Sequence, residues 1–203
     1  MSNFHIFIKR FVDLFLSAIA LLVSCLFLVL AITIISITTK KFGLYSSTRI
    51  GKYGHPFTMW KIKTMKTHPS INTTITTIND PRITKFGRLL RHTKLDELPQ
   101  LWNVLKGDMS LVGPRPDVPG FADQLQGEDR IILTVRPGVT GLATLAFRNE
   151  EKLLANQKNP ERYNQKVIWP EKVRLNKLYI EKYSLFLDFK ILFKTLFGES
   201  VSI

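Results

Sequence analysis

The chain has 203 residues, of which 45% are hydrophobic and 22% charged. These globular values exclude a disordered tail, a collagen-like fibre and a transporter with many membrane spans, and the length suits one domain with an appendage. Twenty-nine Lys and Arg against sixteen Asp and Glu give a net charge of +13, so we expect an anionic partner: nucleic acid, an acidic membrane face or a phosphorylated substrate. The single cysteine, Cys25, cannot form an intramolecular disulfide, which indicates a reducing compartment for the soluble part.

The first predicted element is an apolar helix over residues 14–39, which carry no charged side chain. As a helix this segment would measure about 39 Å, against about 30 Å for the hydrocarbon core of a bilayer. Basic pairs flank it on both sides, Lys9-Arg10 and Lys40-Lys41, so the positive-inside rule does not select an orientation. Two topologies stay open: a straight span, or a re-entrant helix that bends and returns to the cytoplasmic face. Ser24-Cys25 offers only a weak break for the bend.

The next region is expected to combine short strands with helices. Gly and Pro punctuation predicts a pair of strands within residues 42–66, and the Thr- and Asn-rich stretch 69–80 is typical of a surface loop. Apolar residues at helical spacing predict two helices within 82–106, separated near Thr93, and Gly107 is a plausible stop for the second.

The last third of the chain alternates rigid loops with helix. Pro and Gly in segments 112–116 and 135–141 exclude helix interiors and predict rigid loops there. Residues 173–197 are again helical in pattern and rich in aromatic side chains. These aromatic residues either lie along a membrane interface or pack into the core; both interpretations stay open. They are Tyr179, Tyr183, Phe186, Phe189, Phe193 and Phe197.

Adjacent carboxylates in an apolar context are the most suggestive local feature. Asp96 and Glu97 lie between leucines and follow several basic residues; such carboxylates are costly unless cations, a metal or function neutralise them. A structural alternative is a capping box, with Thr93 as N-cap and Asp96 at the third helical position. The two roles can coexist.

Two arginines are stiffened by prolines, which favours anion binding. Arg115 lies between Pro114 and Pro116, and Arg136 precedes Pro137-Gly138; rigid guanidinium groups suit phosphate oxygens. The four histidines lack the spacing and companions of a zinc site. The chain also lacks the glycine-rich nucleotide-binding motifs.

Motifs along nearly the whole chain resemble those of the bacterial sugar transferases, also called small monotopic phosphoglycosyl transferases. The run from Asp80 to Pro116 is too long and specific to arise by chance. The motifs that carry the resemblance are Lys9-Arg10-x-x-Asp13, Arg49-x-Gly51-x-x-Gly54-x-x-Phe57, Lys61-x-Lys63, Asp80-Pro-Arg82, Gly87-Arg88-x-Leu-Arg91, Leu95-Asp96-Glu97-Leu-Pro-Gln100, Val112-Gly-Pro-Arg-Pro116, Arg136-Pro-Gly-x-Thr-Gly141, Arg148-Asn149 and Asp188-x-Lys190.

The resemblance implies an α+β, mainly helical fold: a membrane-embedded, re-entrant helix at 1–41 and a compact cytoplasmic catalytic domain at 42–203 with short strands and interfacial helices. It implies an enzyme of the bacterial inner membrane that moves a sugar 1-phosphate from a UDP-sugar to polyprenyl (undecaprenyl) phosphate and releases UMP, the first step of glycoconjugate assembly. Its partners would be these two substrates and membrane lipids, without nucleic acid. Whether copies of the chain form a homo-oligomer is left open, as is the identity of the sugar.

Site residues follow from the same resemblance. Asp96 would be the nucleophile that carries a covalent phospho-sugar, and Glu97 would help to hold Mg²⁺ together with Asp96. Cations at phosphate or metal-site contacts would be Lys63, Arg91, Arg115, Arg136 and Arg148.

Some residues depart from the family pattern. No proline precedes Pro56, although the family's re-entrant helix is usually bent at a Ser-Pro pair. Thr144 occupies a position that often holds Gln, and segment 150–170 resembles a version found in part of the family. Two other classes remain as alternatives: a membrane-anchored basic binding module, which explains the charge but not the Asp-Glu pair, and a scaffold in a polysaccharide assembly complex.

Overall fold

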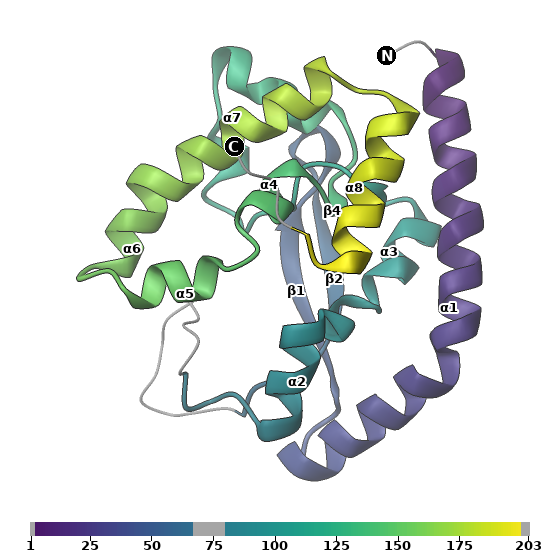
Figure 1. Ribbon diagram of the computed structural model, residues 1–203, viewed down its shortest axis with the longest axis vertical. Coiled ribbons are helices and arrows are strands. Elements are labelled where there is room, and N and C mark those ends of the chain that lie inside the picture. The colour runs from purple at the N-terminus through teal and green to yellow at the C-terminus, as the bar shows by residue number, and fades with distance from the viewer. Residues whose placement is uncertain (1–2, 67–79, 200–203) are drawn as a thin grey trace.

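The computed structural model describes residues 3–66 and 80–199. Its longest element is α1 (Asn3–Thr39), which runs along one side of the molecule and changes direction part-way along (Figure 1). The helix is long and apolar enough to cross a membrane, as predicted. Near its middle the Ser24 Oγ donates to the Ala20 carbonyl at 2.6 Å, a contact to the preceding turn that tends to bend helices. This bend occurs without a proline.

Both halves of α1 pack against the rest of the chain. In the first half, Leu16, Ala20 and Leu21 contact the main core cluster, which includes Val104 and Met109. In the second half, the buried side chains of Ala31 and Ile35 pack against Ile62 and Leu90. The helix is therefore an integral wall of the fold along both of its halves.

Polar contacts fasten the first half of α1 to distant segments. Asp13 accepts hydrogen bonds from Ser110 Oγ at 2.7 Å and from the Leu111 amide at 3.1 Å. Lys9 Nζ lies 2.7 Å from Asp188 Oδ2. Because these groups are buried or nearly so, satisfying them fixes the rotation of α1 against the chain.

A β-hairpin follows α1, which confirms the predicted strand pair. It consists of β1 (Leu44–Ile50) and β2 (Pro56–Ile62), antiparallel and joined through the short helix η1 (Lys52–Gly54). Tyr45 lies opposite Lys61, and Arg49 opposite Phe57. Since side chains alternate along a strand, Tyr45, Ser47 and Arg49 share one face with Lys61.

The expected two helices are present within 82–106: α2 (Lys85–Thr93) and α3 (Gln100–Lys106), separated by the single-turn helix η2 (Leu95–Glu97). Gly107, at a φ of 104°, ends α3 as predicted. The capping-box interpretation is wrong. Thr93 is the last residue of α2 and donates back to the Leu89 carbonyl at 2.9 Å, and η2 begins at Lys94 without a side-chain cap.

The predicted loop at 135–141 contains a short strand. β4 (Gly138–Thr140) pairs in parallel with β3 (Ser110–Val112). The chain that connects the two strands contains the short helices η3 (Ala122–Gln124) and η4 (Gly127–Thr134). A Cβ on Gly138 would lie 2.1 Å from the Gly113 amide nitrogen. The glycines are therefore what lets the two backbones approach, a role that the loop interpretation did not include.

The C-terminal third is helical. It comprises α4 (Leu142–Ala146), α5 (Glu150–Ala155), α6 (Pro160–Tyr163), η5 (Asn164–Ile168), α7 (Trp169–Glu181) and α8 (Leu185–Phe197). The predicted helical stretch 173–197 is thus two helices, and Ser184 caps the second through its Oγ. The core interpretation is confirmed for Tyr179, which is buried, whereas Phe186, at 78% exposure, lies on the outer face with Phe189, Phe193 and Phe197. For these exposed residues the membrane interface stays a prediction. Of the loop predicted at 69–80, residues 69–79 lie outside the described residues.

Candidate active site

The adjacent carboxylates lie in η2, at the junction between α2 and α3. Lys94 precedes them in the left-handed conformation at a φ of 61°, which turns the chain sharply so that both acidic side chains point inward. Asp96 is 6% exposed and Glu97 8% exposed. Two buried carboxyl groups in succession require strong compensation.

Two cations from different elements compensate Glu97. Lys61 Nζ of β2 lies 2.8 Å from Glu97 Oε1, and the guanidinium of Arg115, in the proline-bounded loop after β3, donates to Oε1 at 2.5 Å and to Oε2 at 3.3 Å. Burial opposes ionisation of Glu97, but Arg115 and Lys61 hold its pKa well below the ordinary value. Glu97 raises the pKa of Arg115 in return. Glu97 is therefore a fixed anion that positions two cations.

Asp96 has the opposite character. Its Oδ1 is buried, and within 3–66 and 80–199 neither carboxylate oxygen accepts a hydrogen bond. Burial, and secondly the negative charge of Glu97, raise the pKa of Asp96 to about 6, against the influence of Lys61, Arg91 and Lys94. At neutral pH the group is mostly ionised yet poorly solvated, which is the state required of a carboxylate nucleophile.

The structure places two further predicted cations on the same side of the fold. Arg91 of α2 forms an ion pair with Glu151 of α5 and donates to Thr64 Oγ1 at 3.4 Å, and it contributes to the field at Asp96. Lys63 directly follows β2; in the part of the chain that the structure describes, its side chain makes no hydrogen bond or ion pair. Arg91 therefore has a carboxylate partner, whereas the side chain of Lys63 has none among the described residues.

Arg136 and Arg148 contact other parts of the fold. Arg136 Nε donates to the Gly107 carbonyl at 2.8 Å, beside Arg10, which donates to the Val104 carbonyl at 2.8 Å. Both arginines thereby satisfy carbonyls at the C-terminal end of α3. Arg148 Nη1 donates to the Thr195 carbonyl of α8 at 3.4 Å. These contacts are not with the carboxylate pair, so a phosphate-binding role for Arg136 and Arg148 stays a prediction.

Comparison with known proteins identifies the family of the chain. The model of the family described as "Bacterial sugar transferase" matches residues 4–200. The chain belongs to the bacterial sugar transferase family.

Similar proteins come from several bacteria. A relative from Klebsiella pneumoniae, named UDP-glucose:undecaprenyl-phosphate glucose-1-phosphate transferase, is 35% identical over 97% of this chain, which spans 41% of that protein. From Bacillus subtilis (strain 168), a putative undecaprenyl-phosphate N-acetylgalactosaminyl 1-phosphate transferase is 38% identical over 61% of this chain and 70% of its own length. The uncharacterized sugar transferase EpsL of the same strain is 35% identical over 91% of this chain and 83% of its own length.

Lys61 is the candidate site residue that sequence reasoning did not select. The Lys61-x-Lys63 pattern offered two lysines on one face of a strand, and the resemblance suggested only Lys63. The register of β1 with β2 and the inward turn at Lys94 bring Lys61 onto Glu97. Strand alternation put both lysines on one face, but only tertiary packing distinguishes them.

The carboxylate pair offers oxygen atoms of the kind that bind Mg²⁺ in proteins. Within the described ranges, no group of three or more His, Cys, Asp or Glu side chains is placed to hold a metal ion. Mg²⁺ commonly binds through one or two carboxylates together with substrate phosphates and water. The unbonded Asp96 Oδ1 is a suitable oxygen ligand, and Glu97 is the adjacent one, although Lys61 and Arg115 already contact both of its oxygens.

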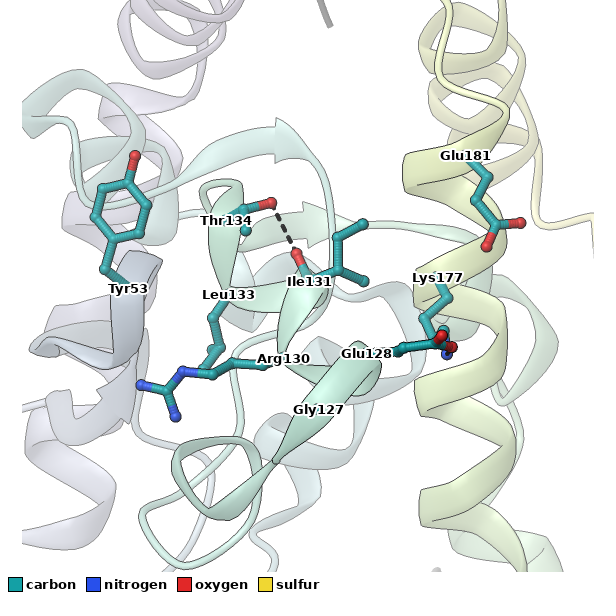
Figure 2. Close-up of a pocket in the computed structure, with 9 residues that line it drawn as sticks. All are labelled: Tyr53, Gly127, Glu128, Arg130, Ile131, Leu133, Thr134, Lys177 and Glu181. Atoms are coloured by element: carbon teal, nitrogen blue, oxygen red, sulfur yellow. Dashed lines mark hydrogen bonds and ion pairs between the residues drawn. The ribbon is translucent and has the colours of Figure 1, made fainter.

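A cavity of about 670 Å³ lies away from these residues (Figure 2). It opens between η1, η4 and α7, with Tyr53 on one side and Lys177 and Glu181 on the other. None of the predicted site residues lines it. The chemistry of the sugar transferase is therefore assigned from the carboxylate pair and not from the size of a cavity.

Proposed function

We propose that the chain transfers a sugar 1-phosphate from a UDP-sugar to undecaprenyl or another polyprenyl phosphate, through a covalent intermediate on Asp96. The observation that carries the proposal is a buried, ionisable carboxylate without hydrogen bonds, adjacent to a carboxylate that two cations neutralise. The names of the relatives from Klebsiella and Bacillus support the reaction class.

The reaction has two displacements at one phosphorus atom. In the first, an Asp96 carboxylate oxygen bonds to the β-phosphorus of the UDP-sugar, and the bond from that phosphorus to the bridging oxygen breaks. UMP leaves with the bridging oxygen and its electron pair. In the second, an oxygen of the polyprenyl phosphate bonds to the same phosphorus and the bond to Asp96 breaks. The division into two steps means that the two bulky substrates need not react directly.

The cations of the site supply charge stabilisation. Phosphoryl transfer depends mainly on positioning and on neutralising the phosphate oxygens. Arg115 and Lys61 are held rigidly by Glu97, so both present positive charge beside Asp96 without reorganisation. Arg91 of α2 adds further positive charge at Asp96.

Magnesium is the proposed cofactor, with Asp96 and Glu97 as its protein ligands. When bound, the ion would neutralise charge on the donor's diphosphate. Chelation is expected to abolish UMP release, and addition of Mg²⁺ to restore it. Undiminished release in chelator would contradict the assignment of Glu97 as a metal ligand.

The proposed location is the bacterial inner membrane, with the site on its cytoplasmic face and α1 re-entrant. Two features support this topology. Both halves of α1 pack on the same domain, so a straight crossing would draw the hairpin and α2 into the hydrocarbon. The outer face of α1 is apolar, with Phe7, Leu22 and Ile37 all more than 70% exposed, as is the outer face of α8, so both faces suit lipid contact.

The decisive experiment mixes purified protein with a panel of UDP-sugars, Mg²⁺ and polyprenyl phosphate and measures UMP. We expect release with at least one donor, and none with the Asp96→Asn variant. Without acceptor, mass spectrometry is expected to detect a phospho-sugar adduct on Asp96. Folded wild-type protein that releases no UMP from any donor would overturn the proposal, and an unchanged protein mass would overturn the covalent step.

A further inference from the structure

Two charged side chains near the carboxylate pair have no bonding partner. Arg49 of β1 and Asp117, which follows Pro116, are both half-buried. In the described part of the chain neither side chain forms a hydrogen bond or an ion pair, and the Nε of Arg49 is fully buried. Half-buried charges that lack hydrogen bonds are costly. Such an arrangement is expected where a ligand completes the contacts.

The backbone holds these two residues next to each other and next to Arg115. The Ile50 amide donates to the Asp117 carbonyl at 2.9 Å, which fastens the proline-bounded loop to the end of β1. This contact places Asp117 beside Arg49, the residue that precedes Ile50. Burial lowers the pKa of Arg49 and raises that of Asp117, and each of the two charges opposes the shift of the other. The two side chains nevertheless form no ion pair with each other, and the buried Nε of Arg49 has no hydrogen-bond partner in the described part of the chain.

Lys172 of α7 adds a third charge that acts on this pair. Its Nζ is held by Glu150 of α5, at 2.8 and 2.9 Å from the two carboxylate oxygens, and it is one of the cations that influence Asp117. Burial raises the pKa of Asp117 to about 6, with Lys172, Arg49 and Arg115 opposing the rise. Arg49 of β1 and Lys172 of α7 are therefore two cations that act on the Asp117 carboxylate, which forms no ion pair with the described residues.

This arrangement continues the reactive site along the hairpin. Arg49 shares a face of the hairpin with Lys61, which contacts Glu97. Lys61 lies opposite Tyr45, four residues from Arg49, so the separation along the strand is about 13 Å. Arg115 lies between the two ends: it contacts Glu97 and influences both Arg49 and Asp117.

We propose that Arg49, Asp117 and Lys172 form the subsite that binds the hydroxyl and amide groups of the donor's sugar, and that Asp117 determines specificity among UDP-sugars. This inference rests on the proposed function. Closely spaced acceptors and donors match a polyol, whose hydroxyls can donate to a carboxylate and accept from Lys and Arg. A diphosphate is a poor occupant, because the Asp117 carboxylate would repel it. A uracil ring offers a single N–H donor.

The test compares the binding of UDP with that of UDP-sugars, in the full chain purified with Mg²⁺. Because the wild type is expected to react with the donor, titration calorimetry is done in an Asp96→Asn background, with and without Asp117→Asn, and gives the affinities for UDP, UDP-glucose, UDP-galactose and UDP-N-acetylgalactosamine. We expect Asp117→Asn to weaken the preferred UDP-sugar about 10- to 100-fold, because it loses a charged hydrogen bond. UDP affinity is expected to stay unchanged. The control variant, Asp129→Asn, removes a surface carboxylate that pairs with Lys177 and should alter neither affinity.

Three other outcomes would overturn the inference: equal weakening of UDP and UDP-sugar, unchanged affinity for every ligand, or weakening that does not depend on the sugar. A second variant, Lys172→Met, should weaken the same sugar and spare UDP, so that misfolding of one variant does not decide the result. Failure of the proposed function is separate. In that case the wild type would release no UMP, while the binding difference between UDP and UDP-sugar could still be measured.

Discussion

Asp96 and Glu97 are neighbours in sequence whose carboxyl groups respond to the same burial in opposite ways. Arg115 and Lys61 contact Glu97 directly, so its pKa falls despite desolvation. Asp96 receives no hydrogen bond from the residues that the structure describes, and burial together with the neighbouring anion Glu97 raises its pKa to about 6. Divergent pKa values in adjacent acids commonly mark different chemical roles, here a nucleophile and a residue that holds cations.

The raised pKa of Asp96 predicts a pH-dependent gain in stability for Asp96→Asn in metal-free protein. The folded state disfavours the ionised form, so the wild type bears a cost above pH 6 that disappears as the pH falls toward 4. Taking the shift from 3.8 to about 6, the cost at pH 8 is at most about 3 kcal/mol. We expect the Asn variant to unfold at a higher temperature at pH 8, with a smaller difference at pH 5.

Thermal unfolding in detergent with chelator measures this difference, and Asp129→Asn is the control, since that carboxylate lies on the surface. A variant that is less stable than wild type at pH 8, or a difference that does not change between pH 8 and pH 5, would show that Asp96 is not destabilised by its surroundings.

Removal of Arg115 is expected to affect both stability and activity. Arg115→Met leaves Glu97 buried with Lys61 alone, a loss that commonly costs about 3–5 kcal/mol for a buried pair. UMP release should fall at least about 100-fold, because a rigid positive charge beside the phosphate is lost. Arg115→Lys should restore part of the stability but little activity, since an ammonium cannot contact both oxygens as a guanidinium does.

A double variant tests whether the loss of stability comes from Glu97. In Arg115→Met with Glu97→Gln, the carboxylate that Arg115 neutralised is gone but Lys61 loses its partner, so only part of the stability should return, and UMP release should stay low because a cation and a proposed metal ligand are both missing. Chemical denaturation and the UMP assay report the two quantities independently. Full activity in either variant would remove Arg115 from the proposed mechanism.

At the scale of elements, the packing of α2 depends on a close contact between its first turn and the chain that follows β2. Thr84 Oγ1 accepts a hydrogen bond from the Gly87 amide at 2.9 Å, and a Cβ on Gly87 would lie 2.3 Å from the Thr64 carbonyl oxygen. That oxygen belongs to the backbone, so no change of side-chain rotamer can relieve the contact. Gly87 thus sets the distance between α2, which carries Arg91, and the chain that continues from β2.

Gly87→Ala is therefore expected to destabilise the protein by about 1–3 kcal/mol through overpacking. This direction is informative, because alanine in a helix interior normally stabilises by about 1 kcal/mol relative to glycine. Arg88→Ala, at an exposed position of the same helix, is the control and should have little effect. Thermal unfolding measures both variants; a Gly87→Ala protein as stable as wild type would contradict the close contact.

At the scale of the whole molecule, a re-entrant α1 predicts that both of its ends face the cytoplasm. In a Cys25→Ser background, single cysteines at Ser2 and Lys41 should react with a membrane-impermeant maleimide only after the cell membrane is opened. A periplasmic cysteine of another protein in the same cells serves as the positive control. Labelling of one position in intact cells would show a straight crossing and contradict the hairpin.

Local patterns predicted most of the elements, and their failures have physical causes. The spacing of apolar residues and the positions of Gly and Pro predicted the apolar helix, the hairpin, the helices around Thr93 and the end of the second helix at Gly107. The capping box failed because Thr93 bonds back into α2, and the sequence pattern does not distinguish the end of one helix from the start of another. The strand β4 was missed because its partner, β3, is distant in sequence.

The sequence predicted the carboxylate pair, but it did not predict which side chains surround the pair. Motif resemblance suggested Arg115, which contacts Glu97, and also Arg136, whose guanidinium satisfies the Gly107 carbonyl. Prolines stiffen both arginines equally, so rigidity alone does not show where a side chain points. The contact of Lys61 with Glu97 and the proximity of Arg49 to Asp117 depend on strand register and loop docking, which only the folded chain specifies.

The packing of α1 along both halves means that this helix is a structural component of the enzyme and not a detachable tether. A chain truncated at Gly43 would lose the side chains that cover Ile62 and Leu90 and the carboxylate that Ser110 and Leu111 bind. Deleting the apolar segment to gain solubility would therefore expose core side chains to solvent and promote aggregation. Biochemical work on this protein calls for detergent or lipid from the first step.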